Sequence, residues 1–205
     1  MGFTTTPQRF RVAVTGGIGS GKSYVCRLLE QRGISIYDCD AQAKRLMRTS
    51  ATLQHQLSDT IGANIAPCGH IDKALLSRYL LASEDNKARV NAIVHPAVIA
   101  DFLASPYTWM ESAILFESGY AHVVQCIVCV CCPDAVRIER ICQRDGITPT
   151  QARQWIDAQW PQERVRQMAH LVVDNDGTTP LTPQIDNLLQ RIGDMQTDYN
   201  NSHTI

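Results

Sequence analysis

The sequence has no excess of basic charge, no long hydrophobic run and no internal repeat. Its 205 residues include 19 Lys and Arg against 20 Asp and Glu, which gives a formal net charge of -1. A chain so balanced offers no basic field to nucleic acid or to an anionic membrane, so we expect neither as a partner. No apolar stretch is long enough to span a bilayer, and no signal-peptide pattern is present. We therefore expect a soluble cytoplasmic protein, whose length fits one α/β core with inserted subdomains.

The sequence also lacks a ligand pattern for a structural metal, although it has eight cysteines. Four of them, Cys126, Cys129, Cys131 and Cys132, lie in or beside an apolar strand pattern. Neighbouring strand residues face opposite ways, so Cys131 and Cys132 cannot easily share a metal, and no second ligand pair with zinc spacing follows. We expect buried free thiols, since cysteine in such a strand behaves as a small hydrophobe.

Both ends of the chain are polar. We expect residues 1–9 to form a frayed leader, an interpretation that we favour over myristoylation at Gly2. The tail after Asp198 is expected to be disordered as well.

The stretch RVAVTGGIGSGKS, residues 11–23, carries a phosphate-binding pattern. A short apolar strand over 12–15 runs into Gly16, and Gly21, Lys22 and Ser23 follow at the spacing of G-x-x-x-x-G-K-[ST]. Glycines at 16, 17, 19 and 21 allow positive φ and let the backbone approach a ligand without Cβ clashes.

A helix that begins at Lys22 would add unpaired N–H groups and the positive end of its dipole to this turn. We therefore predict a polyphosphate site rather than a glycine-rich hairpin turn. Lys22 would reach the β- and γ-phosphates, and the Ser23 hydroxyl would ligate Mg²⁺.

Two carboxylates follow the next strand pattern. A helix over 22–32 and a strand over 34–37 complete a strand, helix, strand unit, which implies a parallel sheet. The strand ends at Asp38 and Asp40, and ligands of such sheets bind beyond the carboxyl ends of strands. We expect at least one of these carboxylates to act in phosphoryl transfer to a hydroxyl, while one can also cap the next helix.

The remaining strand patterns would bring their carboxyl ends to the same edge of the sheet. A third strand over 109–116 would end at Glu117 and aim this carboxylate into the cleft, the alternative being a solvated turn acid. A fourth strand covers 127–131, and a fifth covers 171–173. Thr182 and Pro183 predict the start of the last helix.

Two stretches between the strands have helical patterns. Residues 50–105 predict an all-helical insertion that closes over an acceptor substrate. His95 precedes Pro96 and is therefore expected at a bend, where substrate binding and a structural role both stay open.

The second helical stretch is basic and resembles a mobile lid. We expect Arg140 and Arg144 to compensate phosphate charge, whereas Arg153 and Arg166 fit a solvated helix face better. A capping box at Thr148 predicts a helix that runs to about Gln159.

These motifs, in this order, resemble the dephospho-coenzyme A kinase family over almost the whole chain, from Arg11 to Ile192. The matching motifs are TGGIGSGKS, D-x-D-x-x-A-[RK], N-x-[IL]-x-HP, LFE, R-x-x-x-RD and V-x-DN-x-G, at residues 15–23, 38–44, 91–96, 115–117, 140–145 and 172–177.

The resemblance implies transfer of the ATP γ-phosphate to the ribose 3′-hydroxyl of dephospho-coenzyme A, with Mg²⁺, in the last step of coenzyme A synthesis. It implies a nucleoside-monophosphate-kinase-like α/β fold, a parallel five-stranded P-loop sheet flanked by helices. The implied parts are a nucleotide core over 1–49, 106–139 and 171–205, an acceptor domain over 50–105, and a lid over 140–170.

The resemblance also implies a role for each matching residue. Asp40 would be the base that takes the hydroxyl proton, Asp38 would act through the metal's waters, and Lys22 and Arg140 would act on the phosphates. His95 and Glu117 would line the acceptor side. Contacts to ATP would come from Gly17, Ile18, Gly19, Ser20, Gly21, Lys22, Ser23, Tyr24, Arg144 and Asn175, and metal ligands from Ser23 and Asp38.

Three other functions compete with this interpretation. Another small-molecule kinase on the same scaffold differs only in its acceptor. A GTPase needs the guanine-reading N-K-x-D, and Asn86-Lys87-Ala88-Arg89 lacks the acid. A non-catalytic nucleotide-binding module would not need the acids and arginines named above. We expect a monomer.

Overall fold

The structure is a computed structural model that describes residues 9–203. Our expectations for Gly2 and for nearly all of the leader fall on residues 1–8, which lie outside the described residues. Among the described helices, none is long and apolar enough to cross a membrane.

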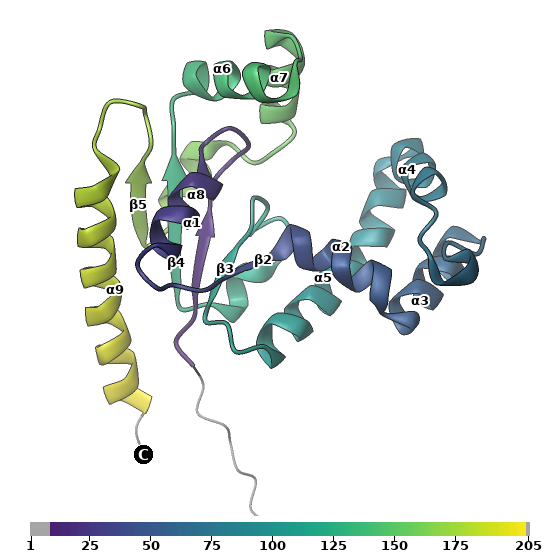
Figure 1. Ribbon diagram of the computed structural model, residues 1–205, viewed down its shortest axis with the longest axis horizontal. Coiled ribbons are helices and arrows are strands. Elements are labelled where there is room, and N and C mark those ends of the chain that lie inside the picture. Colours follow the sequence, from purple (N-terminus) through teal and green to yellow (C-terminus); the bar gives the residue numbers. More distant parts are fainter. Residues whose placement is uncertain (1–8, 204–205) are drawn as a thin grey trace, which may run out of the picture.

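A five-stranded parallel sheet forms the centre of the fold, as predicted. Its strand order is β2-β3-β1-β4-β5, and every neighbouring pair is parallel, so all carboxyl ends meet at one edge. β1 lies in the middle of the sheet, which places the phosphate-binding stretch at the centre of that edge (Figure 1). The strands are β1 (Val12–Thr15), β2 (Ile36–Asp38), β3 (Trp109–Glu111), β4 (Cys126–Cys131) and β5 (Leu171–Asp174).

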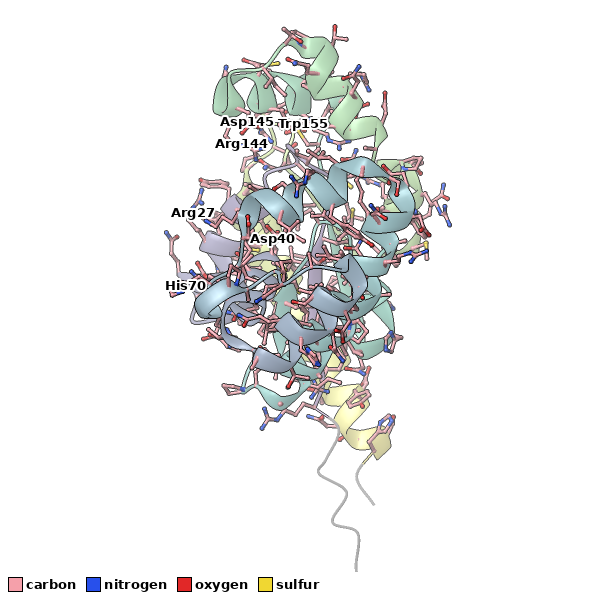
Figure 2. All side chains as sticks on the ribbon, turned by 90° about the vertical axis from the view of Figure 1, so that its right-hand side faces the viewer. Arg27, Asp40, His70, Arg144, Asp145 and Trp155 are labelled. Carbon is pink, nitrogen blue, oxygen red and sulfur yellow. The ribbon has the colours of Figure 1, made fainter. Side chains whose placement is uncertain are left out.

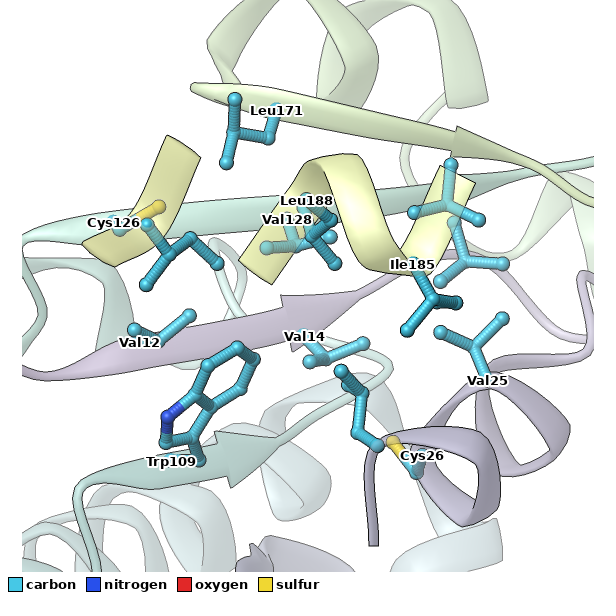
Figure 3. Packing of buried hydrophobic residues seen from close by; sticks show 14 of the residues in the cluster. Val12, Val14, Val25, Cys26, Trp109, Cys126, Val128, Leu171, Ile185 and Leu188 are labelled. Carbon is cyan, nitrogen blue, oxygen red and sulfur yellow. The ribbon is translucent and has the colours of Figure 1, made fainter. Parts of the chain in front are cut away.

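Helices α1 (Lys22–Glu30) and α9 (Leu181–His203) pack on one face of the sheet. Val12, Val14 and Val128 of the sheet meet Val25 of α1 and Ile185 of α9 in one apolar cluster (Figure 3). The cysteines of β4 are buried in the sheet, as the apolar pattern predicted.

The expected disorder after Asp198 is wrong up to His203. The last helix continues because Tyr199 finds a partner, packing edge to face on Phe10 with ring centroids 5.5 Å apart. Tyr199 also stacks on His203 at 4.1 Å.

Helices follow one another without an intervening strand from residue 39 to residue 104, as the patterns predicted for 50–105. They extend from the other side of the sheet (Figure 1) and share a cluster with it, in which Phe102 from the last of these helices packs edge to face on Tyr37 of β2 with ring centroids 5.3 Å apart. The elements are α2 (Cys39–Thr49), α3 (Ala51–Ile61), the short 3-10 helix Pro67–Gly69, α4 (Lys73–Ala82) and α5 (Glu84–Ala104).

The predicted bend at His95 is wrong, because α5 continues through Pro96. Proline within a helix removes one backbone hydrogen bond and costs about 3 kcal/mol. Burial of Val90, Val94 and Val98 along one face of α5 favours the continuous helix despite that cost. His95 therefore lies in the middle of a helix.

The third strand is shorter than predicted and ends at Glu111 instead of running to Phe116. Residues 113–119 form tight turns, in which Ser118 N donates to Ile114 O and Tyr120 N donates to Leu115 O. A short apolar run can be a buried turn as well as a strand, and its periodicity does not distinguish the two.

Three helices lie between β4 and β5. The capping box at Thr148 is confirmed, since its side chain and that of Gln151 bond each other's backbone N–H. The first two of these helices project beyond the carboxyl edge of the sheet (Figure 1). Their bounds are α6 (Asp134–Asp145), α7 (Pro149–Asp157) and α8 (Gln162–Met168).

Truncation of Leu57 tests the packing of the helical stretch from α2 to α5. Leu57 is fully buried, so we expect Leu57→Ala to lower the free energy of unfolding by about 2–5 kcal/mol through lost burial and a cavity. Leu81→Ala is the control, because Leu81 is 81% exposed and should change stability by less than about 0.5 kcal/mol. Urea-induced unfolding measures both, and equal midpoints would contradict the packing.

Candidate active site

The phosphate-binding stretch folds as a tight turn between β1 and α1. Gly16 has φ 146° and lies against the carbonyl oxygen of Val130, with which any Cβ at this position would overlap. Gly21 has φ 85° and is the N-cap of α1. The helix therefore begins with its unpaired N–H groups directed at the turn, which is the arrangement that binds phosphate groups.

Gly17 does not have the positive φ that was predicted for it. A Cβ at Gly17 would instead overlap the guanidinium of Arg137, which is 2% exposed. Arg137 Nε donates to the Ile18 carbonyl oxygen at 2.9 Å, and its Nη1 lies 3.0 Å from Asp134. Arg137 thus supports the turn from α6, a role that the sequence did not show.

Asn175 fixes the other side of the turn. Its amide Nδ2 donates to the Ser20 carbonyl oxygen at 2.8 Å, and its backbone N–H donates to Cys131 O. Asn175 is 7% exposed and lies against Gly21, where a Cβ would overlap the amide. The loop after β5 therefore reaches the phosphate-binding turn.

Lys22 is nearly buried and faces a carboxylate that the sequence interpretation missed. Its Nζ lies 3.5 Å from Glu111 Oε1 at the end of β3. Burial raises the pKa of the Glu111 carboxyl, and the Lys22 ammonium opposes that shift. Register could have identified Glu111, because it pairs with Val14 of β1 and with Asp38 of β2.

Asp38 and Asp40 extend this acidic edge from the start of α2. Asp38 Oδ1 accepts from Ala41 N at 2.9 Å, so the predicted helix cap is confirmed. Asp40 Oδ2 pairs with Lys44 Nζ at 2.8 Å, one turn along the helix. Both carboxylates are exposed to the solvent of the cleft, so a ligand can reach them.

One cleft of about 790 Å³ brings most of the predicted site residues together. It runs from the phosphate-binding turn to the inner sides of α2 and α5. The predicted residues that line it are Ile18, Gly19, Gly21, Lys22, Ser23, Tyr24, Asp38, Asp40, His95, Arg140 and Arg144.

The two arginines of α6 that line the cleft, Arg140 and Arg144, enter it differently. Arg140 donates to Ser20 O at 3.4 Å and to Cys132 Sγ at 3.3 Å, and it has no carboxylate within 4.0 Å among residues 9–203. Arg144 is exposed and pairs with Asp145 at 2.7 Å. Figure 2 shows Arg144 and Asp145 above Arg27 and Asp40 on the same side of the molecule.

Of the two residues predicted for the acceptor side, one lines the cleft and the other does not. His95 lines the cleft, packs edge to face on Tyr120 at 5.4 Å, and has its pKa lowered by burial. Glu117 does not line the cleft, because β3 ends six residues earlier. Its Oε1 accepts instead from Trp160 N at 3.2 Å.

The cleft fits a magnesium ion that is held mainly by substrate. The Ser23 hydroxyl and the carboxylates of Asp38 and Glu111 supply hard oxygen ligands, which Mg²⁺ prefers. In the part of the chain that the structure describes, no three His, Cys, Asp or Glu residues form a metal-binding group. Such a donor set suits an ion that binds with one or two protein oxygens and completes its shell with phosphates and water.

Comparison with known proteins gives a consistent result. A family model for dephospho-CoA kinase matches residues 10–180. The chain belongs to the dephospho-CoA kinase family. It is therefore a kinase, and the predicted resemblance is confirmed.

Individual relatives agree with the family match. A dephospho-CoA kinase of Bacteroides fragilis is 40% identical over 182 residues, covering 85% of this chain and 89% of the relative. A crystal structure from Thermus thermophilus superposes with a TM-score of 0.73 at 26% identity, over 90% of this chain and 96% of that one. The dephospho-CoA kinase of Campylobacter jejuni, at 19% identity, has a TM-score of 0.62 over 92% and 98% of the two chains and shares the fold.

Substitution of Gly16 tests the fit of the phosphate-binding turn. We expect Gly16→Ala to weaken ATP binding at least tenfold, on the order of 1.4 kcal/mol, because the added Cβ pushes the turn away from β4. Gly33→Ala is the control: Gly33 also has positive φ, but no atom lies within 4 Å of its Cβ position. Calorimetric titration with ATP should separate the two variants, and equal ATP affinity would contradict the clash.

Proposed function

We propose that this chain transfers the γ-phosphate of ATP to the ribose 3′-hydroxyl of dephospho-coenzyme A and so forms coenzyme A. One observation carries the proposal: a single cleft is lined by both the phosphate-binding turn and the D-x-D carboxylates. Transfer to a hydroxyl needs a phosphate cradle and a carboxylate base within one enclosed site. The family match adds the acceptor, which the geometry alone does not distinguish.

On the donor side, the turn from Gly17 to Tyr24 would hold the ATP phosphates. Backbone N–H groups at the start of α1 would cradle the phosphate oxygens, and Lys22 would leave Glu111 to meet the β- and γ-phosphates. Asn175 lies on the side of the turn nearest β5, where the adenosine of ATP would extend.

Ser23 and Asp38 would hold the magnesium ion, Asp38 through bound water, with Glu111 as a further carboxylate beside them. A magnesium ion held by these residues would supply positive charge against the negative charge that develops during transfer. The Asp38 carboxylate is held in place for this task by its bond to Ala41 N.

On the acceptor side, Asp40 would take the proton of the 3′-hydroxyl. Its only ion-pair partner among the described residues is Lys44, and both side chains are well exposed, so the carboxylate is free to turn toward a substrate. His95 would contact the acceptor from α5. Glu117 is withdrawn from the acceptor site, because its carboxylate contacts the backbone after α7.

The helices around the cleft would act as the acceptor domain and the lid. We retain the division into a core over 1–49, 106–139 and 171–205, an acceptor domain over 50–105 and a lid over 140–170. Closure of the lid would exclude water, which otherwise competes with the acceptor for the phosphate. The monomeric state, the cytoplasmic location and the lack of nucleic-acid or membrane partners stay predictions.

The direct test is ADP release with ATP and Mg²⁺, measured with a panel of acceptors. Release with dephospho-coenzyme A, and formation of coenzyme A, supports the proposal. Release only with a nucleoside monophosphate or shikimate would keep the phosphate site and reject the acceptor. Tight ATP binding without release to any acceptor would favour a binding module.

Asp40→Asn tests the assignment of the base. An amide cannot accept the hydroxyl proton, so we expect turnover to fall by about 10²–10⁴-fold, while the ATP dissociation constant stays near that of the wild type. Asp85→Asn is a matched control, since Asp85 also lies in the first turn of a helix. It likewise forms an ion pair with a basic side chain four residues later, that of Arg89, at 2.8 Å. Near-normal turnover of Asp40→Asn would place the base elsewhere.

Arg140→Ala tests charge compensation from the lid. Arg140 has no carboxylate partner among the described residues and reaches the phosphate-binding turn, so we expect kcat to fall by about 10²–10³-fold. Arg153→Ala is the control, because Arg153 pairs with Asp134 outside the cleft. Loss of thermal stability with unchanged kcat would show that Arg140 is structural.

A further inference from the structure

Two consecutive residues after α7 contact both walls of the cleft. Gln159 reaches the phosphate-binding turn, and Trp160 reaches the turns that follow β3. The two walls are otherwise far apart in sequence, at residues 16–21 and 112–120.

Gln159 fixes the tip of the phosphate-binding turn. Its Oε1 accepts from Ile18 N at 2.7 Å, while Arg137 Nε donates to Ile18 O at 2.9 Å. Ile18 is therefore held at both polar atoms of its backbone by side chains from the 134–160 segment. The same Oε1 would lie 3.3 Å from a Cβ at Gly17, so the turn and the amide fit closely.

Trp160 makes three contacts, and two of them hold it to the opposite wall. Its backbone N–H donates to Glu117 Oε1 at 3.2 Å. Its ring stacks on Phe116 with centroids 5.8 Å apart and planes 3° from parallel. The guanidinium of Arg164 covers the ring at 3.4 Å from its centroid.

The wall that Trp160 contacts belongs to the acceptor side of the cleft. Ser112, Ala113 and Ile114 of these turns line the cleft, as does Tyr120, which packs on His95. Phe116 and Glu117 lie in the same turns but outside the cleft. A shift of Trp160 would therefore move the acceptor wall without touching the substrate.

We propose that Gln159 and Trp160 form a clamp that sets the distance between the bound γ-phosphate and the acceptor hydroxyl. Gln159 lines the cleft and is then a positioning residue of the kinase reaction, since its amide oxygen acts through Ile18. The proposal rests on the proposed function and adds a residue pair that the motifs do not assign. Its physical basis is that in-line transfer is sensitive to displacement, so that an error of about 1 Å can cost about 10²-fold in rate.

Gln159→Leu tests the clamp, because leucine fills similar space but cannot accept from Ile18 N. We expect kcat to fall at least tenfold, which is less than the roughly 10²-fold cost of a 1 Å displacement. KM for ATP should stay within about threefold of the wild-type value. Gln159→Asn repeats the test with a shorter amide that cannot reach, should leucine disturb folding.

Gln125→Leu is the matched control. Gln125 Oε1 also accepts a backbone N–H, that of Arg11 at 2.8 Å, but at the opposite end of β1 from the cleft. A merely structural role predicts equal losses of melting temperature and equal kcat in the two variants. Equal kcat for Gln125→Leu and both Gln159 variants would overturn the clamp.

The second half of the clamp is tested with Glu117→Leu, which cannot accept from Trp160 N, and with the double variant that adds Gln159→Leu. If the dipeptide works as a unit, the effects of the two changes on kcat are not additive. Additive effects would mean two independent contacts and would overturn the proposal. Wild-type turnover with dephospho-coenzyme A is measured alongside: its absence counts against the proposed function, and the clamp is then tested with whichever acceptor releases ADP.

Discussion

The close fit of the phosphate-binding turn against its neighbours is the constraint on which the site depends. The Val130 carbonyl of β4, the Arg137 guanidinium and the Asn175 amide occupy space that a side chain at Gly16, Gly17 or Gly21 would need. The turn is thus supported from three segments distant in sequence. The glycines do two physical tasks here, since some adopt positive φ and Gly17 makes room for a buried cation. These contacts favour a phosphate cradle that is preorganised before a ligand binds.

The early end of the third strand decides which of two carboxylates lies in the cleft. Because β3 ends at Glu111, the acid beside Lys22 is Glu111, and Glu117 moves behind the acceptor wall. Glu117 lies outside the cleft, and its Oε1 accepts from the backbone N–H of Trp160. The acid expected in the site and the acid found there thus exchange roles, although both lie within seven residues of each other. The shift also explains how the segment after α7 can be joined to the acceptor wall.

Local sequence patterns predicted the fold well. The features that they did not predict depend on contacts between residues far apart in the sequence. The sheet, the phosphate-binding turn, the cap at Asp38 and the capping box at Thr148 each have a signal within a few residues, and all are present. The local sequence around Pro96 predicts a break in the helix. The helix continues because burial of its apolar face outweighs that preference. Gln159 carries no signal at all, because glutamine is common at helix ends and its partner at Ile18 is 141 residues away. Propensity is local, whereas a side-chain bond across the fold depends on packing that a single sequence does not display.

The strand order accounts for how the cleft divides its charges. β1 lies centrally, with β3 and β2 on one side and β4 and β5 on the other. Acids therefore enter from one side, where β3 and β2 end, and arginines enter from the other side, where β4 leads into α6. Lys22, at the start of α1 after β1, lies between the two groups. A hydroxyl that attacks a phosphate needs a proton acceptor on its own side and positive charge on the phosphate side. Because parallel strands end at one edge, the carboxylates and the arginines approach that edge from opposite sides of β1. At roughly 4.8 Å per strand spacing, Glu111 at the end of β3 is one spacing from β1, and Asp40 after β2 is two spacings away. The proposed base and the proposed charge compensation would then both reach the phosphate without neutralising each other.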